Sequence, residues 1–249
     1  MIKPMFFVVS LMLLFSFGEA VAQEKKFNRS SFLRVEAQEV KEDANFGLVF
    51  RGAGISYGMR WENKTDKKLL FIEYDLVVKF MFSRGIPGIG FYLKPIEVSQ
   101  MFGVSLKGKR LYFGPFFKAE YNYFLYPDLQ AGFDYWLSHF SIGPNLSYSF
   151  GCKNSLITLN AGTTILGLTS RQPFIRNPYY YDLGFKHALK HLHQDIRFGS
   201  FNRFNSTRIE LLWQPNPEKE FGLGYALNFT GYYRAPVFAQ FCHSLKLAF

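Results

Sequence analysis

Cysteine is scarce in this sequence, which has only Cys152 and Cys242 among 249 residues. A small scaffold held together by disulfides is therefore excluded, because such scaffolds are rich in cysteine. Cys152 falls in a predicted turn and Cys242 in the middle of a predicted strand, so their heights differ too much for a strain-free bridge. We expect both cysteines to be unpaired.

Long apolar runs are absent after residue 22. A membrane-spanning helix needs about 20 consecutive apolar residues, so helical spans are excluded. The short run from Met5 to Phe17 follows the positive Lys3 and precedes Ala20-Val21-Ala22, a small-x-small cleavage site. This pattern predicts a cleaved secretory signal peptide over residues 1–22. No cysteine follows the cleavage site, so no lipid attachment is expected.

Aromatic residues, by contrast, are abundant, with 30 Phe and 15 Tyr. Together with aliphatic residues they alternate with small or polar residues, which is typical of β-strands. A soluble β-sandwich and a transmembrane β-barrel both show such alternation. Here one face carries Phe, Tyr, Leu and Ile, whereas the other carries Gly, Ser, Asn and isolated charges. These faces favour a barrel with an apolar exterior and a crowded polar interior.

The last strand shows this pattern most clearly and ends on Phe249. Its outward face is predicted to comprise Val237, Ala239, Phe241, Leu245, Leu247 and Phe249. Its inward face is predicted to comprise Gln240, Cys242, Ser244 and Lys246.

An export signal followed by such a C-terminal strand resembles the general class of Gram-negative outer-membrane β-barrels. The resemblance covers the architecture and matches no particular family. It implies localisation in the bacterial outer membrane, and recognition of the C-terminal Phe249 by the barrel-insertion machinery.

The alternation predicts an all-β fold, a transmembrane antiparallel up-and-down barrel of about ten strands, with eight or twelve as alternatives. Residues 23–45 are charged and are predicted to be a periplasmic lead-in, so the barrel would occupy residues 46–249. The longest connection, about 170–205, is expected to be an extracellular loop. The predicted strands lie at about 46–62, 69–83, 96–106, 111–123, 129–137, 140–150, 155–169, 206–214, 221–230 and 237–249.

The connections assigned to the outer side are strongly basic and hold most of the formal net charge of +10. Two interpretations stay open: a solvated loop surface, and contact with the phosphates of lipopolysaccharide. Nucleic acid is not expected as a partner of an exported barrel. The basic residues are Lys64, Lys67, Lys68, Lys107, Lys109, Arg110, Arg171, Arg176, Lys186, Lys190, Arg197 and Arg203.

Charges of both signs are predicted to face the barrel lumen. A ten-stranded barrel leaves little internal room, and buried charges must be paired or hydrated. An internal ion-pair network that plugs the lumen is therefore favoured over a narrow polar pore. The predicted lumen charges are Glu73, Asp75, Lys79, Lys118, Glu120, Asp134, Glu210 and Lys246.

Three residues of the long loop could hold a metal ion. If the loop forms an amphipathic helix, His187, His191 and Asp195 lie one turn apart in a column. Two imidazoles and a carboxylate are ligands that zinc accepts. Because a further ligand is missing, packing over the barrel mouth is the favoured role, and no cofactor is expected.

A second group could carry hydrolytic chemistry. His139 and Ser141 share one face of a strand by the two-residue period, and Asp134 lies nearby in the sequence. A serine needs a base, and the base an acidic partner, to become a nucleophile. The flanking residues do not resemble those of outer-membrane lipid A deacylases.

The sequence therefore favours a non-enzymatic, monomeric membrane barrel serving as a scaffold, a surface contact or a secretion accessory. A narrow porin-like channel and a lipid-active hydrolase are the alternatives.

Overall fold

The computed structural model describes residues 27–43, 47–106, 109–127, 134–171, 196–216, 221–235 and 237–249. These residues form one twelve-stranded antiparallel sheet. Its strands are β1 (Asn28–Glu42), β2 (Leu48–Lys64), β3 (Lys68–Ser83), β4 (Ile86–Leu106), β5 (Lys109–Leu125), β6 (Asp134–Cys152), β7 (Ser155–Thr163), β8 (Leu166–Arg171), β9 (Arg197–Ser200), β10 (Phe204–Gln214), β11 (Gly222–Tyr232) and β12 (Phe238–Ala248).

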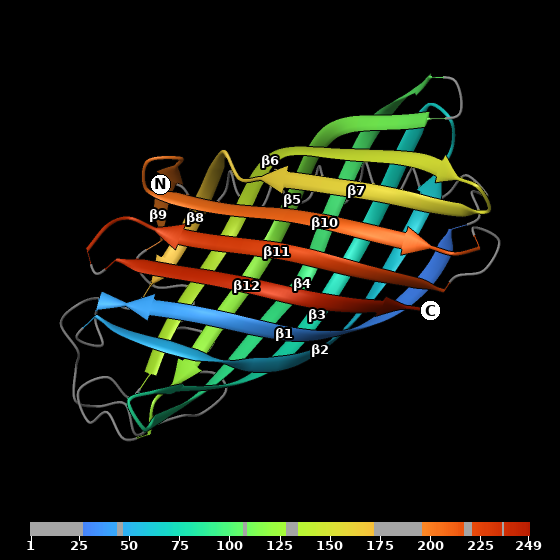
Figure 1. Cartoon of the computed structure of the whole chain (residues 1–249). Helices are drawn as coiled ribbons and strands as arrows, with labels where there is room; N and C mark the ends of the chain where they lie inside the picture. Colours follow the sequence, from blue (N-terminus) through green and yellow to red (C-terminus); the bar gives the residue numbers. More distant parts are fainter. Residues whose placement is uncertain are drawn as a thin grey trace.

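Ten of these strands close into a barrel, because the first strand pairs with the last (Figure 1). The β1–β12 register runs from Phe32 opposite Ala248 to Glu42 opposite Phe238. Beyond it, Ser31 and Phe249 exchange two backbone hydrogen bonds of 2.8 and 2.9 Å. The predicted antiparallel up-and-down barrel of ten strands is confirmed.

The strands β8 and β9 extend the wall at one end. β8 pairs with the same strand as β7, placing Arg171 opposite Leu137 of β6. β9 pairs with β8 in turn. The barrel wall itself passes from β7 directly to β10.

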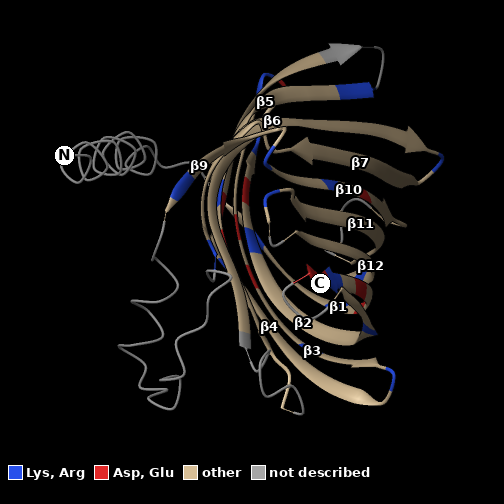
Figure 2. Ribbon diagram, turned by 90° about the vertical axis from the view of Figure 1, so that its left-hand side faces the viewer, with Lys and Arg blue, Asp and Glu red and all other residues tan. Residues whose placement is uncertain are grey.

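The two faces of each strand carry opposite kinds of side chain. In β3, Glu73 and Lys79 are buried inside, whereas Phe80 on the other face is 58% exposed. Acidic and basic positions lie along the strands of the wall (Figure 2). The apolar exterior and charged interior are the reverse of a soluble domain, as a lipid-facing barrel requires.

The segment predicted as a periplasmic lead-in, residues 23–45, contains β1, and the barrel therefore begins before residue 46. Strand β1 alternates between buried and exposed positions over most of its length. Its inward residues include Arg34 and Glu36, and these charges masked the two-residue period. The segment is charged because it lines the lumen.

The predicted number of ten strands was right for compensating reasons. The missed β1 adds one strand, and the predicted strands 129–137 and 140–150 are one continuous strand, β6. In addition, the strand predicted at 96–106 begins earlier, at Ile86. The signal peptide predicted over residues 1–22 lies outside the described residues.

The extra strand reverses the direction assigned to the first five predicted strands. We call the end where β1 begins and β12 ends the terminal end, and the opposite end the loop end. Lys64, Lys67 and Lys68 lie at the terminal end, as does the start of β5 at Lys109. The prediction that these basic turns share one side with the long loop was wrong.

The loop end carries the longest connection, between β8 and β9. Arg171, Arg197 and Arg203 lie at this end. Within the described parts of the chain, no helix is long and apolar enough to cross a membrane.

Candidate functional site: the barrel lumen

The predicted lumen charges lie inside the barrel. Seven of them are at most 7% exposed, whereas the side chain of Asp134 lies outside the described part of the structure. The seven are Glu73, Asp75, Lys79, Lys118, Glu120, Glu210 and Lys246.

Glu73 of β3 is the centre of the largest group of ion pairs. Its carboxylate accepts hydrogen bonds from Lys94 Nζ at 2.7 Å and Arg208 Nη1 at 2.9 Å. Arg60 lies 3.7 Å away as a third cation. Since Lys94 also donates to Glu97 at 2.7 Å, the group joins four strands across the lumen.

The network continues through Glu210 of β10. Arg208 donates to one of its oxygens and Lys246 to the other, at 2.7 and 2.8 Å. Lys94, Glu97 and Arg208 were not among the predicted lumen residues. Lys94 escaped because it lies before the predicted start of this strand at residue 96, beside a bulge between Leu93 and Ile96 that interrupts the two-residue period.

Strand β1 contributes two further ion pairs that the sequence analysis missed. Arg34 pairs with Asp75, and both are buried. Glu36 lies 3.6 Å from Lys79. The sequence does contain evidence for these two inward residues, since Arg34 and Glu36 are two residues apart and therefore share a face of one strand.

The hydrolase candidates are close together but enclosed. Ser141 Oγ lies 3.3 Å from His139 Nδ1. The acidic group beside His139 is Glu120: Glu120 Oε2 lies 2.6 Å from His139 Nε2, although outside hydrogen-bond geometry. The side chain of Asp134, the predicted partner, lies outside the described part of the structure. Glu120 is opposite His139 in the β5–β6 register.

Two features argue against catalysis by this group. Ser141 and His139 are 2% and 1% exposed, and the ring of Phe204 packs 4.5 Å from that of His139. Glu120 also accepts hydrogen bonds from Lys118 and Tyr92, at 2.9 and 2.8 Å. The carboxylate is therefore part of the ion-pair network.

The network surrounds a small cavity. Its volume is ≈ 80 Å³, and a water needs about 10–15 Å³ on the same measure. The cavity has room for several waters and not for a large ligand. Six basic and six acidic side chains line it, so their formal charges cancel.

A cluster of mostly aromatic residues, which we call the aromatic cap, lies at the loop end of the barrel. It is a cluster of residues that are each at most 5% exposed. Phe124 stacks on Tyr135 with centroids 5.8 Å apart, and Tyr135 on Phe238 at 5.0 Å. The cap comprises Val40, Phe50, Met81, Phe124, Tyr126, Tyr135, Leu137, Phe204, Tyr232 and Phe238.

An ion pair is embedded in the cap. Arg171 of β8 pairs with Glu42 of β1, and both are buried. The Arg171 guanidinium lies over the rings of Tyr135 and Tyr232, 5.2 and 5.0 Å from their centroids. Arg171, which was predicted as a loop cation, is therefore buried within the aromatic cap.

The metal candidates His187, His191 and Asp195 lie outside the described residues. Within the described ranges, no group of three or more His, Cys, Asp or Glu could hold a metal ion. Cys152 and Cys242 are both free thiols, the first exposed and the second buried beside Glu36.

Comparison with known proteins gives matches of structure alone. No protein-family profile and no curated protein matches the sequence. The translocator domain of the autotransporter NalP from Neisseria meningitidis aligns at 6% identity and a TM-score of 0.41, over 98% of this chain and 95% of that one. The outer-membrane protease OmpT from Escherichia coli aligns at 9% identity and a TM-score of 0.46, over 91% and 97%. These values are too low to support a conclusion about the role of this chain.

The fold itself defines the class of protein. A closed antiparallel barrel with an apolar exterior and a polar interior is the architecture of the bacterial outer-membrane β-barrels.

Proposed function

We propose that this chain is a closed, non-conducting barrel of the bacterial outer membrane, which acts through its surface as a scaffold, a surface contact or a secretion accessory. The observation that carries the proposal is the filled lumen, in which equal numbers of cations and anions pair beneath the aromatic cap.

The ion-pair network supports closure because its members hold one another in place. An ion that crossed the lumen would have to displace pairs such as Lys94–Glu73, whose side chains are 2% and 1% exposed. Breaking a buried pair leaves an uncompensated charge and costs about 3–5 kcal/mol. The aromatic cap would add a second barrier, because its rings pack against one another at the loop end.

The length asymmetry of the connections supports an orientation. Bacterial barrels have short periplasmic turns and longer extracellular loops, which would place the loop end outside the cell. Phe249 would then lie on the periplasmic side, where the barrel-insertion machinery could bind it.

Contact with lipopolysaccharide is a further part of the proposal. At the loop end, Arg197 and Arg203 are exposed beside Phe198 and Phe201, which are 59% and 53% exposed. Guanidinium groups can pair with lipid phosphates, and the rings can contact acyl chains at the membrane interface. Binding of purified lipopolysaccharide measures this contact.

Single-channel recording in planar bilayers tests the closed lumen. The wild-type barrel, shown to be folded by its heat-dependent gel mobility, should give no discrete conductance steps. The triple variant Phe124→Ala, Tyr126→Ala, Phe238→Ala, which opens the cap, should give brief, small steps. Its matched control removes three lipid-facing rings instead, as Phe91→Ala, Phe102→Ala, Phe113→Ala, and should stay silent.

Reproducible steps from the folded wild-type barrel would reject the proposal and favour the narrow channel. The ion selectivity of those steps should then change on neutralising Glu73 or Lys118.

A further inference from the structure

A histidine faces outward in the middle of the apolar wall. His243 is the sixth of the eleven residues of β12 and lies between Phe241 and Leu245, which are 42% and 65% exposed. With a rise of about 3.4 Å per residue and a tilt of about 45°, it lies roughly 12 Å from each end of the strand. This height is near the centre of a lipid-facing band about 25 Å tall.

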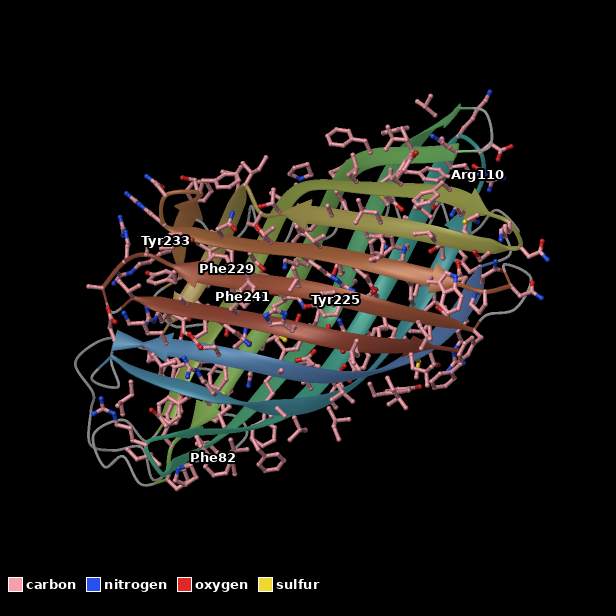
Figure 3. All side chains as sticks on the ribbon, viewed as in Figure 1. Phe82, Arg110, Tyr225, Phe229, Tyr233 and Phe241 are labelled. Atoms are coloured by element: carbon pink, nitrogen blue, oxygen red, sulfur yellow. The ribbon has the colours of Figure 1, made fainter. Side chains whose placement is uncertain are left out.

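The histidine has one polar neighbour on the same surface. The hydroxyl of Tyr225 on β11 lies 2.5 Å from His243 Nδ1, and Tyr225 is itself 41% exposed. The ring of Phe241 packs edge-on against His243 with centroids 4.8 Å apart. Tyr225, Phe229 and Phe241 lie on the β11–β12 part of the wall (Figure 3).

One hydrogen bond leaves this pair half satisfied. If Tyr225 donates to Nδ1, then Nε2 carries a proton that has no partner among the described residues, and the phenol oxygen keeps a free lone pair. If Nδ1 donates instead, Nε2 is a free acceptor and the phenol a free donor. In both tautomers, one donor and one acceptor face the lipid.

Lipid cannot satisfy either group. Unpaired polar groups in the hydrocarbon region cost several kcal/mol, and ionisable residues facing lipid at this depth destabilise a barrel. A second protein surface with a donor and an acceptor at matching height would satisfy both groups.

We propose that a second copy of this chain docks on the β11–β12 face, with the two Tyr225–His243 pairs meeting across a two-fold axis. In a two-fold interface the same patch is present on both sides, so the free donor of each copy can meet the free acceptor of the other. The match holds for either tautomer. Around it, Leu245 and Phe241 of each copy would pack against their counterparts.

This inference rests on the proposed membrane location of the barrel and departs from the monomer that the sequence favours.

Counting dimers in vesicles tests the inference. Wild-type protein carrying one fluorophore per chain is reconstituted in phosphatidylcholine vesicles, and dimers are counted by single-molecule photobleaching over a range of protein-to-lipid ratios. Failure of the barrel to insert would contradict the membrane location. Insertion as a monomer at all ratios would overturn the dimer alone.

Two variants test the polar pair. His243→Leu and Tyr225→Phe should each raise the protein-to-lipid ratio for half dimerisation about tenfold, since two interfacial hydrogen bonds are lost. Phe229→Leu, which changes a nearby lipid-facing ring without a polar group, should leave the ratio within about twofold. Dimers that persist unchanged in both variants would overturn the proposal.

A stability measurement separates this role from a structural one. At low protein density, His243→Leu should raise the urea midpoint of the monomeric barrel, because it removes a polar group from lipid. A lowered midpoint would mean that the histidine supports the fold of its own chain.

In a Cys152→Ser background, oxidation should crosslink Leu245→Cys between copies and spare Ile142→Cys, which lies on β6, four strands away in the wall.

Discussion

At the scale of single residues, the stability of the lumen depends on compensation of charge. Glu73 faces three cations, Lys94, Arg208 and Arg60, and is 1% exposed. Its burial is tolerable only because these partners lie within 4 Å. If the carboxylate were neutralised, Lys94 and Arg60 would each lose one of two acidic partners, and Arg208 would lose one of three.

Glu73→Gln should therefore lower the free energy of unfolding by about 3–5 kcal/mol, the cost of breaking a buried pair. Urea titration of the protein in vesicles measures the change. Glu39→Gln is the control, because Glu39 pairs with Arg51 on the surface, where side chains are 50% and 76% exposed. This variant should change stability by about 0.5 kcal/mol or less, and equal losses in the two variants would contradict the argument.

Residue-level prediction from sequence succeeded where the two-residue period was uninterrupted. Glu73 and Lys79 of β3 were placed inside because their outward neighbours are all apolar. Arg34 and Glu36 were missed because β1 has few large apolar residues to contrast with its charges. The partner of His139 was missed because Glu120 is close only through the β5–β6 register, which a local pattern does not contain.

At the scale of elements, two Gly-Pro pairs shape the junction of β5 and β6. Pro115 lies directly opposite Pro144, and Gly114 opposite Asn145. Neither proline can donate to the ladder. A Cβ at Gly143 would lie 1.9 Å from the carbonyl oxygen of Thr163, so the glycine permits close approach of the neighbouring strand.

Gly143→Ala should destabilise the barrel by about 1–3 kcal/mol, because backbone must shift to admit the methyl group. Thermal or urea unfolding measures the loss. Gly151→Ala on the same strand is the matched control: a Cβ there meets nothing within 4 Å, and the change should be about 0.5 kcal/mol or less. A Gly143→Ala variant as stable as this control would show that the strands do not pack so closely.

Element boundaries were harder to predict than element type. The sequence indicated two strands within this region, at 129–137 and 140–150, where the structure has the single strand β6. In the structure Ser138 is buried and pairs with Tyr121 of β5, so neighbouring strands, not local preference, keep the segment extended.

At the scale of the whole molecule, the basic residues are divided between two ends. Arg110 and Tyr233 mark these ends in Figure 3. The sequence placed all basic connections on one side because the direction of each strand depends on counting every strand before it. One missed strand therefore reversed the assignment of Lys64, Lys67 and Lys68.

This division allows a charge-matched test of lipopolysaccharide contact. Arg197→Ala with Arg203→Ala should weaken binding of purified lipopolysaccharide by about 2 kcal/mol, or about 1 kcal/mol per basic residue. Lys67→Ala with Lys68→Ala removes the same charge at the terminal end, which the proposed orientation places on the periplasmic side, and should weaken binding less. Equal losses would mean that lipopolysaccharide responds to net charge alone.

The pairing of Ser31 with Phe249 has a kinetic consequence. These two residues are separated by nearly the whole chain, and contacts of such sequence separation form slowly. Until they form, β1 and β12 each present an unpaired edge that can add strands of other chains. Aggregation through these edges therefore competes with closure of the barrel until β12 pairs with β1.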